Sequence, residues 1–259
     1  LSQLKTSSDI LNYNLPKDRY YIPTTENGTL VHHKHYRLSY DESAEQSEWV
    51  AYFLTKSSLQ AKNVPRAKRF NRDPLVPTES ASHGDYIRSG YDRGHLVPAA
   101  DMAFSQTAMN ETFYMSNISP QLRQFNGAVW RELEESVRDW AYKYEALYVI
   151  SGPIYGDSQK TIGNAKVRVP EAYFKVLLDL ESKEKKAIAF RLDNKVSYLP
   201  LTDYMITIDE LEDQTGFDFY GNLLEDDIEN RLESEIDPSD WPLSKKRFDL
   251  RNTKWNKVK

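Results

Sequence analysis

The chain of 259 residues contains no cysteine. A disulfide framework, a thiolate metal site and a cysteine nucleophile are therefore excluded, and bridges give no information about the redox compartment. Long apolar runs are also missing. No run approaches the roughly 18 residues that indicate a membrane span, so we expect no membrane partner.

Three common catalytic motifs are missing as well. The sequence has no glycine-rich phosphate loop followed by Lys-Ser or Lys-Thr, no GxSxG turn and no HExxH helix. Each of these motifs places the residues that one particular chemistry needs. Their absence leaves nucleotide hydrolase, serine hydrolase and zinc protease activities without support.

Charge is distributed unevenly around a net value of −5. The segment Lys56–His95 holds eight Lys or Arg against four acids, whereas Thr202–Asp240 holds fourteen acids and one base, Arg231. A basic segment is compatible with a phosphate-bearing partner, although a solvated surface also explains such clusters.

Length and apolar pattern predict one α+β domain over residues 1–259, with mixed or antiparallel sheets and packed helices. A polar acidic turn joins two strand-like runs into a hairpin, and residues 60–90 have no apolar period, which indicates a long surface loop. The expected strands are Tyr36–Tyr40, Trp49–Leu54, Ala146–Ile154, Ala172–Leu180 and Ala187–Leu192, and Ile208–Thr215 is expected to be a short helix that stops at Gly216.

The clearest predicted helix spans Gly127–Tyr144, where apolar residues recur every three to four positions. Asn126 stands where an N-cap would be, and capping is one interpretation of it. At 100° per residue, however, Asn126, Glu134 and Arg138 lie along one flank of the apolar face. A surface ion pair between Glu134 and Arg138 is the simpler alternative for these two residues.

The stretch Asp92-Arg93-Gly94-His95 could face that flank and supply part of a phosphodiester-cleaving site. The neutral form of a histidine such as His95 can take a proton from water, because the unperturbed pKa is about 6.5. The same reaction needs a divalent cation, which prefers oxygen ligands such as the Asn126 carbonyl. A nearby carboxylate then orients the metal's waters, while arginines hold the phosphate.

Three segments in this order resemble the DNA/RNA non-specific endonucleases. They are DRGH at residues 92–95, SNISPQ at 116–121 and NGAVWRELE at 126–134. This ββα-metal (His-Me finger) family includes secreted bacterial sugar-non-specific nucleases and mitochondrial endonuclease G. The resemblance extends from Trp49 through residues 208–219, with little to match beyond about Leu224.

The resemblance implies roles for individual residues. His95 is expected to be the general base and Asn126 the direct Mg²⁺ ligand. Glu134 is expected to contact the waters bound to the metal without binding the metal itself. The expected phosphate contacts are Arg93, Arg138 and one basic residue of the loop before DRGH. The candidates in that loop are Arg66, Lys68, Arg69 and Arg72, of which Arg69 is favoured. Asn117 and Gln121 are expected to shape the nucleic-acid site and hold the loop.

The implied activity is that of a metal-dependent phosphodiesterase. Its substrates are DNA and RNA, its products carry a 5′-phosphate and a 3′-hydroxyl, and Mn²⁺ can substitute for Mg²⁺. A homodimer is compatible with the family, and a first residue Leu1 instead of Met fits a processed leader, so we expect a secreted or periplasmic protein. The alternative is a relative that binds nucleic acid or protein on the same scaffold without catalysis.

Two further groups of residues have competing interpretations. His32, His33 and His35 form a dense cluster, and in a strand His33 and His35 would share a face, so a zinc or copper site is conceivable, although no cysteine or clear third ligand lies on that face. Tyr86 and Tyr91 could stack on bases, but core packing or loop anchoring is the simpler interpretation.

Overall fold

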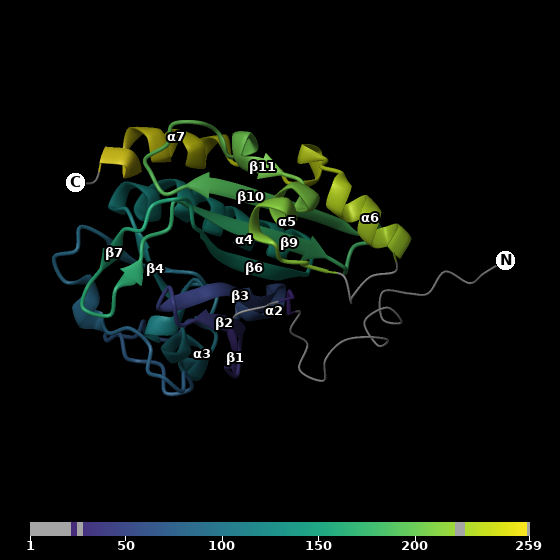
Figure 1. The fold of residues 1–259 in the computed structure, drawn as a ribbon. Helices are drawn as coiled ribbons and strands as arrows, with labels where there is room; N and C mark the ends of the chain where they lie inside the picture. Colours follow the sequence, from purple (N-terminus) through teal and green to yellow (C-terminus); the bar gives the residue numbers. More distant parts are fainter. Residues whose placement is uncertain (1–21, 25–27, 221–225, 258–259) are drawn as a thin grey trace.

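A computed structural model describes residues 22–24, 28–220 and 226–257 (Figure 1). The expectation of one domain over residues 1–259 therefore includes four stretches that lie outside the described residues. No helix in the described part of the chain is both long and apolar enough to cross a bilayer.

Seven strands form one antiparallel sheet in the order β1-β2-β3-β6-β9-β10-β11 (Figure 1). Their bounds are β1 Thr29–His32, β2 Arg37–Asp41, β3 Gln46–Thr55, β6 Ala146–Ile154, β9 Ala172–Asp179, β10 Lys186–Asp193 and β11 Met205–Ile206. Two small antiparallel sheets pair β4 Asp92–His95 with β5 Ile118–Gln121, and β7 Thr161–Ile162 with β8 Val167–Arg168. The expected α+β class is confirmed, with antiparallel sheets.

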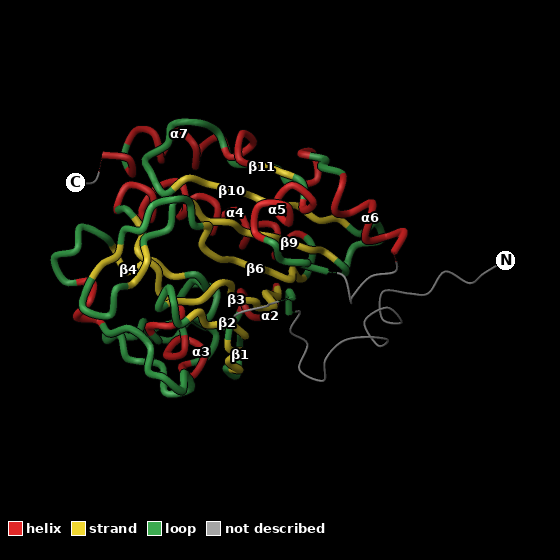
Figure 2. The backbone as a smooth tube through the Cα atoms, in the orientation of Figure 1, coloured by secondary structure: helices red, strands yellow, loops and turns green. Residues whose placement is uncertain are grey.

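Helices pack on both faces of this sheet (Figure 2). The α-helices are α2 Lys56–Gln60, α3 Gln106–Glu111, α4 Arg131–Lys143, α5 Ile208–Thr215, α6 Asp226–Ser234 and α7 Lys245–Thr253. The 3-10 turns are η1 His83–Tyr86, η2 Met115–Asn117, η4 Leu201–Tyr204, η5 Pro238–Asp240 and η6 Trp255–Lys257, and η3 Phe125–Trp130 is a π-helix.

The sequence pattern located most of these elements. The expected hairpin is β2–β3, and the three later strands are β6, β9 and β10 within two residues of the expected ends. The short helix is α5, which starts with a capping box between Thr207 and Glu210 and stops at Gly216, where φ is +73°. The long loop of residues 60–90 is only partly at the surface, because Asp73, Val76 and others within it are buried.

The two faces of the sheet carry separate cores because side chains alternate along each strand. In β3, Val50, Tyr52 and Leu54 belong to the core that contains α4. Trp49 and Ala51 belong to the core that contains residues of α5 and α6. The sheet is therefore covered on one face by α4 and on the other by α5 and α6 (Figure 1).

The predicted helix over Gly127–Tyr144 is composed of two parts. The π-helix η3 covers Phe125–Trp130, and α4 follows from Arg131 to Lys143. Asn126 lies inside η3, with its N–H bonded to the Leu122 carbonyl at 2.8 Å, so the N-cap interpretation is wrong. The wider π turn changes where Asn126 points relative to an ideal helix, and such turns are frequent at functional sites.

Candidate active site

The three segments that carry the family resemblance form one ββα unit. DRGH forms β4, and SNISPQ forms η2 and β5. The two strands pair antiparallel, with Asp92 opposite Gln121 and His95 opposite Ile118. After β5, η3 and α4 carry Asn126 and the downstream charged residues. The fold thus brings together segments that are more than thirty residues apart in sequence.

Gly94 is required by the close packing between these two strands. A Cβ atom at Gly94 would lie 2.2 Å from the side-chain carbonyl of Gln121. The carboxamide of Gln121 is fully buried, and among the described residues neither of its polar atoms has a hydrogen-bond partner. Gln121 therefore lies against β4 at Gly94, and it is not among the residues that line the cavity described below.

A cavity of about 350 Å³ opens where β4, η3 and the loop before DRGH meet. Its lining residues are Arg66, Phe70, Asp92, Arg93, His95, Pro98, Ala99, Ala100, Asn126, Arg131 and Glu134. Four of the residues expected at the site thus line the same cavity: Arg93, His95, Asn126 and Glu134. Cationic, anionic and neutral polar groups are all present there.

His95 is held in a largely apolar surrounding. Its ring lies 5.0 Å from that of Phe113 and 5.7 Å from that of Phe70, measured between centroids, and its Nε2 is buried with no hydrogen-bond partner in the part of the chain that the structure describes. Burial, together with the positive charge of Arg66, lowers the pKa of His95 to about 3. The imidazole is therefore neutral near pH 7, as a proton acceptor must be.

Asn126 is oriented by Asp92. Its Nδ2 donates to Asp92 Oδ2 at 3.3 Å, and Arg123 approaches the other carboxylate oxygen at 3.2 Å. This bond leaves the side-chain carbonyl of Asn126 unused by Asp92, and Asn126, Asp92 and Glu134 all line the cavity. An amide oxygen and carboxylates are donors that suit a hard divalent cation.

Glu134 is accompanied by a buried lysine that the sequence analysis did not single out. Lys175 on β9 is fully buried, and its Nζ lies 4.7 Å from the ring centroid of Trp130 and has no hydrogen-bond partner within residues 22–24, 28–220 and 226–257. Burial raises the pKa of Glu134, an effect opposed by the positive charges of Arg138 and Lys175. Burial lowers the pKa of Lys175, and the charge of Glu134 opposes that change. Each group favours the charged form of the other.

Arg138 is not among the residues that line the cavity. Its Nη1 donates to Asp101 Oδ1 at 2.8 Å, and Tyr52 donates to the other oxygen of Asp101 at the same distance. Asp101 itself is 1% exposed. Arg138 thus forms a partly buried ion pair with Asp101, and its charge helps to hold down the pKa of Glu134. Its contact with phosphate stays a prediction.

The structure brings Arg66 to the cavity instead of the favoured Arg69. Arg66 lines the cavity, and its guanidinium lies 5.0 Å from the ring centroid of Phe113. Arg69 and Lys68 line a different hollow, beside Tyr114. Arg72 is paired with Glu79 at 3.2 Å. Loop geometry, which sequence spacing does not reveal, decides which arginine faces His95.

Asn117 holds the chain that follows DRGH. It is fully buried; its Oδ1 accepts from the Val97 N–H at 2.8 Å, and its Nδ2 donates to the carbonyls of Val97 and Thr112. Both ends of the carboxamide are thus occupied by backbone groups, as a residue that holds the loop requires.

Three residues at the site were not assigned a role from the sequence. Arg131 lines the cavity, bonds Glu135 at 2.8 Å and stacks 4.1 Å from the ring centroid of Trp255. Asp101 and Lys175 are buried charges near Glu134. A lysine within the apolar run of β9 was the available signal for Lys175, whereas nothing local distinguishes Arg131 or Asp101.

The histidine cluster does not form a metal site in the described residues. Strand β1 ends at His32, so His33 and His35 do not share a strand face. His33 Nε2 lies 2.8 Å from Asp73 Oδ2, and both side chains are buried. Tyr86 is in the core, where its hydroxyl donates to the Ile118 carbonyl.

Comparisons with known proteins agree with the ββα unit. The family model of the DNA/RNA non-specific endonucleases matches residues 16–226. A nuclease of Syncephalastrum racemosum is 34% identical over 242 residues, which cover 85% of this chain and 73% of the relative. The mitochondrial nuclease EXOG of Homo sapiens is 35% identical over 203 residues, or 72% of this chain and 55% of the relative. The mitochondrial nuclease of Saccharomyces cerevisiae is 35% identical, over 69% of this chain and 61% of the relative.

A solved structure shares the fold. The crystal structure of an EndoG/EndoGI complex contains a chain with a TM-score of 0.72 and 29% identity, covering 78% of this chain and 89% of that one. The chain spans little more than half the length of the human relative. From the family match, the identity to curated nucleases and the shared fold, we conclude that the chain belongs to the DNA/RNA non-specific endonuclease family, a typically metal-dependent family of phosphodiester hydrolases.

Proposed function

We propose that this chain is a Mg²⁺-dependent endonuclease that hydrolyses DNA and RNA to products with a 5′-phosphate and a 3′-hydroxyl. The observation that carries the proposal is a single cavity lined by the neutral imidazole of His95, by Asn126 and by arginines. Acceptance of a proton and stabilisation of anionic oxygens are the two requirements of phosphodiester hydrolysis.

In the proposed mechanism, His95 accepts a proton from the attacking water. Its low pKa in the free protein keeps it neutral, and desolvation strengthens its interaction with groups that enter the cavity. Arg66 and Arg93 hold the substrate phosphate, with their guanidinium groups placed over Phe113 and Phe70. Stacking against a ring fixes the orientation of a planar guanidinium, which favours paired contacts to phosphate oxygens.

The residues of the cavity fit a hard cation. Asn126 Oδ1 would bind Mg²⁺, and Glu134 would orient water beside it without direct ligation. When bound, Mg²⁺ would neutralise phosphate oxygens and the charge that develops on the leaving oxygen. Mn²⁺ accepts the same oxygen donors and would substitute. Asp92 keeps the carbonyl end of Asn126 available for this role.

Activity on both DNA and RNA follows from the kind of contact that the cavity offers. Arginine contacts to phosphate carry no sequence information, and neither the 2′-hydroxyl nor a base edge is needed for cleavage. The proposed alternative, a binding protein without catalysis, requires the same arginines but gains nothing from a neutral buried His95.

The test is incubation of supercoiled plasmid and of RNA with the protein in Mg²⁺ at pH 6 to 9. Cleavage of both is expected, together with its loss in EDTA and in His95→Ala. His32→Ala is the matched control, because His32 is exposed on β1 and does not line the cavity. Intact substrates with the wild-type protein at every pH would leave only the binding alternative.

Compartment, assembly and domain limits are separate proposals. Secretion or a periplasmic location rests on the resemblance to secreted bacterial nucleases, whereas the relatives above are fungal or mitochondrial. Fractionation of cells that express the full-length gene tests it. A homodimer is tested by light scattering, and a single domain over 1–259 by limited proteolysis.

A further inference from the structure

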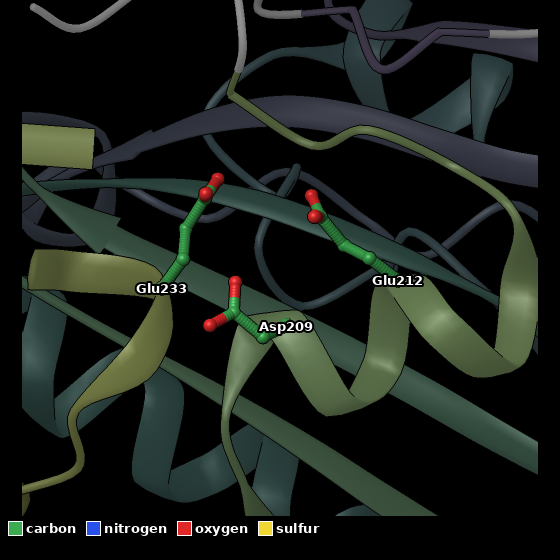
Figure 3. A group of neighbouring side chains, drawn as sticks. All are labelled: Asp209, Glu212 and Glu233. Carbon is green, nitrogen blue, oxygen red and sulfur yellow. The ribbon is translucent and has the colours of Figure 1, made fainter. Parts of the chain in front are cut away.

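Three carboxylates from two helices converge on the face of the sheet opposite α4. Asp209 and Glu212 come from α5, and Glu233 comes from α6 (Figure 3). One oxygen of each lies within 4.8 Å of one oxygen of each of the others. None of the three lines the active-site cavity, so this acidic cluster is separate from the proposed catalytic site.

Glu233 shows that the cluster is more than a solvated acidic surface. The residue is 8% exposed, and its Oε1 is buried with no hydrogen-bond partner in the described part of the chain. Figure 3 shows its carboxyl group directed to the same space as those of Asp209 and Glu212. A buried carboxylate oxygen without a partner is costly unless a proton or a cation satisfies it.

Glu212 is positioned in advance. Its Oε1 accepts the Phe219 N–H at 2.8 Å, which fixes the carboxylate on the side of α5 that faces α6. Ile208 and Leu211 of α5 and Leu232 of α6 belong to the same apolar core on this face of the sheet. The helices that carry the three carboxylates are therefore held in place by packing, and the carboxylates are brought together by the fold.

The charges around the cluster are of one sign. The charged neighbours that act on Glu233 are Glu212, Glu229, Asp209 and Asp218. Burial and these acids raise the pKa of Glu233 to about 8, and burial with the neighbouring acids raises that of Glu212 to about 7. Repulsion of this size is what a bound cation would offset.

We propose that Asp209, Glu212 and Glu233 bind a divalent cation of the Ca²⁺ class that joins α6 to α5. Ca²⁺ takes oxygen ligands at about 2.3–2.6 Å in irregular geometry, so two oxygens on one ion lie no more than about 5 Å apart, a limit that the three carboxylates satisfy. Mg²⁺ needs a tighter octahedron at about 2.0–2.1 Å. Water completes the coordination, because Asp209 is exposed. The role is structural and independent of the proposed nuclease activity.

The experiment measures Ca²⁺ binding and thermal stability in protein stripped with EDTA and desalted. Every variant carries Asn126→Ala, so that the proposed active-site ligand does not bind the added ion. With the cluster intact, we expect one equivalent of Ca²⁺ by calorimetry and a Tm increase of about 5 °C at a hundredfold excess over Kd. In Glu233→Gln, both the binding and the Ca²⁺-dependent increase should disappear.

Two comparisons exclude a merely structural effect of the substitution. Without Ca²⁺, Glu233→Gln should be as stable as its parent or more stable, because glutamine keeps a neutral group where burial and the neighbouring acids disfavour a charged carboxylate. The matched control is Asp213→Asn with Asp227→Asn, which removes exposed carboxylates from α5 and α6 outside the cluster and should leave Ca²⁺ binding unchanged. Equal Ca²⁺ binding in Glu233→Gln, or no Ca²⁺-dependent Tm change with the cluster intact, would overturn the proposal.

Discussion

Asp92 and Asn126 are 34 residues apart in sequence and share a hydrogen bond of 3.3 Å. This bond connects the first residue of DRGH on β4 to the π-helix that precedes α4. It selects which end of the Asn126 carboxamide is left for a cation. The acid of DRGH, Asp92, therefore orients Asn126, which lies on η3.

Asp92→Ala should therefore impair the use of the metal more than the binding of the substrate. Loss of an orienting partner typically costs about 10- to 100-fold in metal affinity or activity, so the Mg²⁺ concentration for half-maximal cleavage should rise by at least about tenfold. The control is Arg123→Ala, since Arg123 is exposed and contacts the other oxygen of Asp92. An Mg²⁺ titration that is the same for Asp92→Ala and wild type would show that Asn126 does not depend on this bond.

Arg66→Ala should reduce kcat/KM, whereas Arg69→Ala should have little effect. Arg66 lines the cavity with His95, and Arg69 lines a different hollow. A hydrogen bond to a charged group contributes about 1.5–3 kcal/mol, which corresponds to roughly 10- to 100-fold in rate. The comparison requires plasmid cleavage at matched ionic strength, because general charge effects are screened by salt. A larger loss of kcat/KM in Arg69→Ala than in Arg66→Ala would support Arg69 as the phosphate contact, as the sequence predicted.

Local pattern predicted the elements of the fold well, because alternation and helix-stop signals depend only on neighbouring residues. Strand β6 and helix α5 have the expected bounds. The π-helix at Asn126 was missed, because an extra residue in a helical turn leaves the apolar period almost unchanged. Its effect is on the direction of one side chain, which periodicity does not measure.

The site was predicted in part for the same reason. Motif order selected His95, Asn126 and Glu134, and all three line one cavity. The same reasoning favoured Arg69, whereas Arg66 lines the cavity, because both lie in a loop whose course has no periodic signal. Lys175 comes from β9 and meets Glu134 only through the packing of sheet against helix. Contacts between distant elements depend on tertiary structure and have no local signal.

Gly94→Ala should destabilise the β4–β5 pair. The added methyl group would approach the Gln121 side chain to 2.2 Å in a buried environment, and overpacking of this kind costs about 1–3 kcal/mol. Urea denaturation measures the loss. Gly127→Ala is the control, because nothing lies within 4 Å of its Cβ position. Gln121→Ala should recover part of the loss in a double variant, and strictly additive effects would show that the two positions do not clash.

Asp73→Asn should lower stability in a pH-dependent way. Burial raises the pKa of Asp73, but hydrogen bonds from His33 and Ser116 outweigh it and leave the pKa below its usual value. The ionised form therefore stabilises the fold above the unfolded pKa of about 3.9, and this contribution is lost as pH falls through the folded pKa. At pH 7, denaturation should show a loss of about 1.5–3 kcal/mol that shrinks below pH 4. Asp139→Asn, at an exposed ion pair, is the control. A deficit that does not change with pH would contradict the ionic role.

Lys175→Met should shift the acid side of the pH–activity profile to higher pH. In the proposed mechanism Glu134 acts in its ionised form, and burial already raises its pKa. Removal of the positive charge of Lys175 raises that pKa further, so Glu134 is protonated earlier as pH falls, whereas His95, with its pKa of about 3, stays neutral. Stability should fall, because the loss of Lys175 leaves Glu134 buried without its opposite charge. Lys186→Met, on β10 and paired with Asp240, should keep the wild-type profile. If kcat/KM of Lys175→Met fell by the same factor at every pH, Lys175 would act through packing and not through the charge of Glu134.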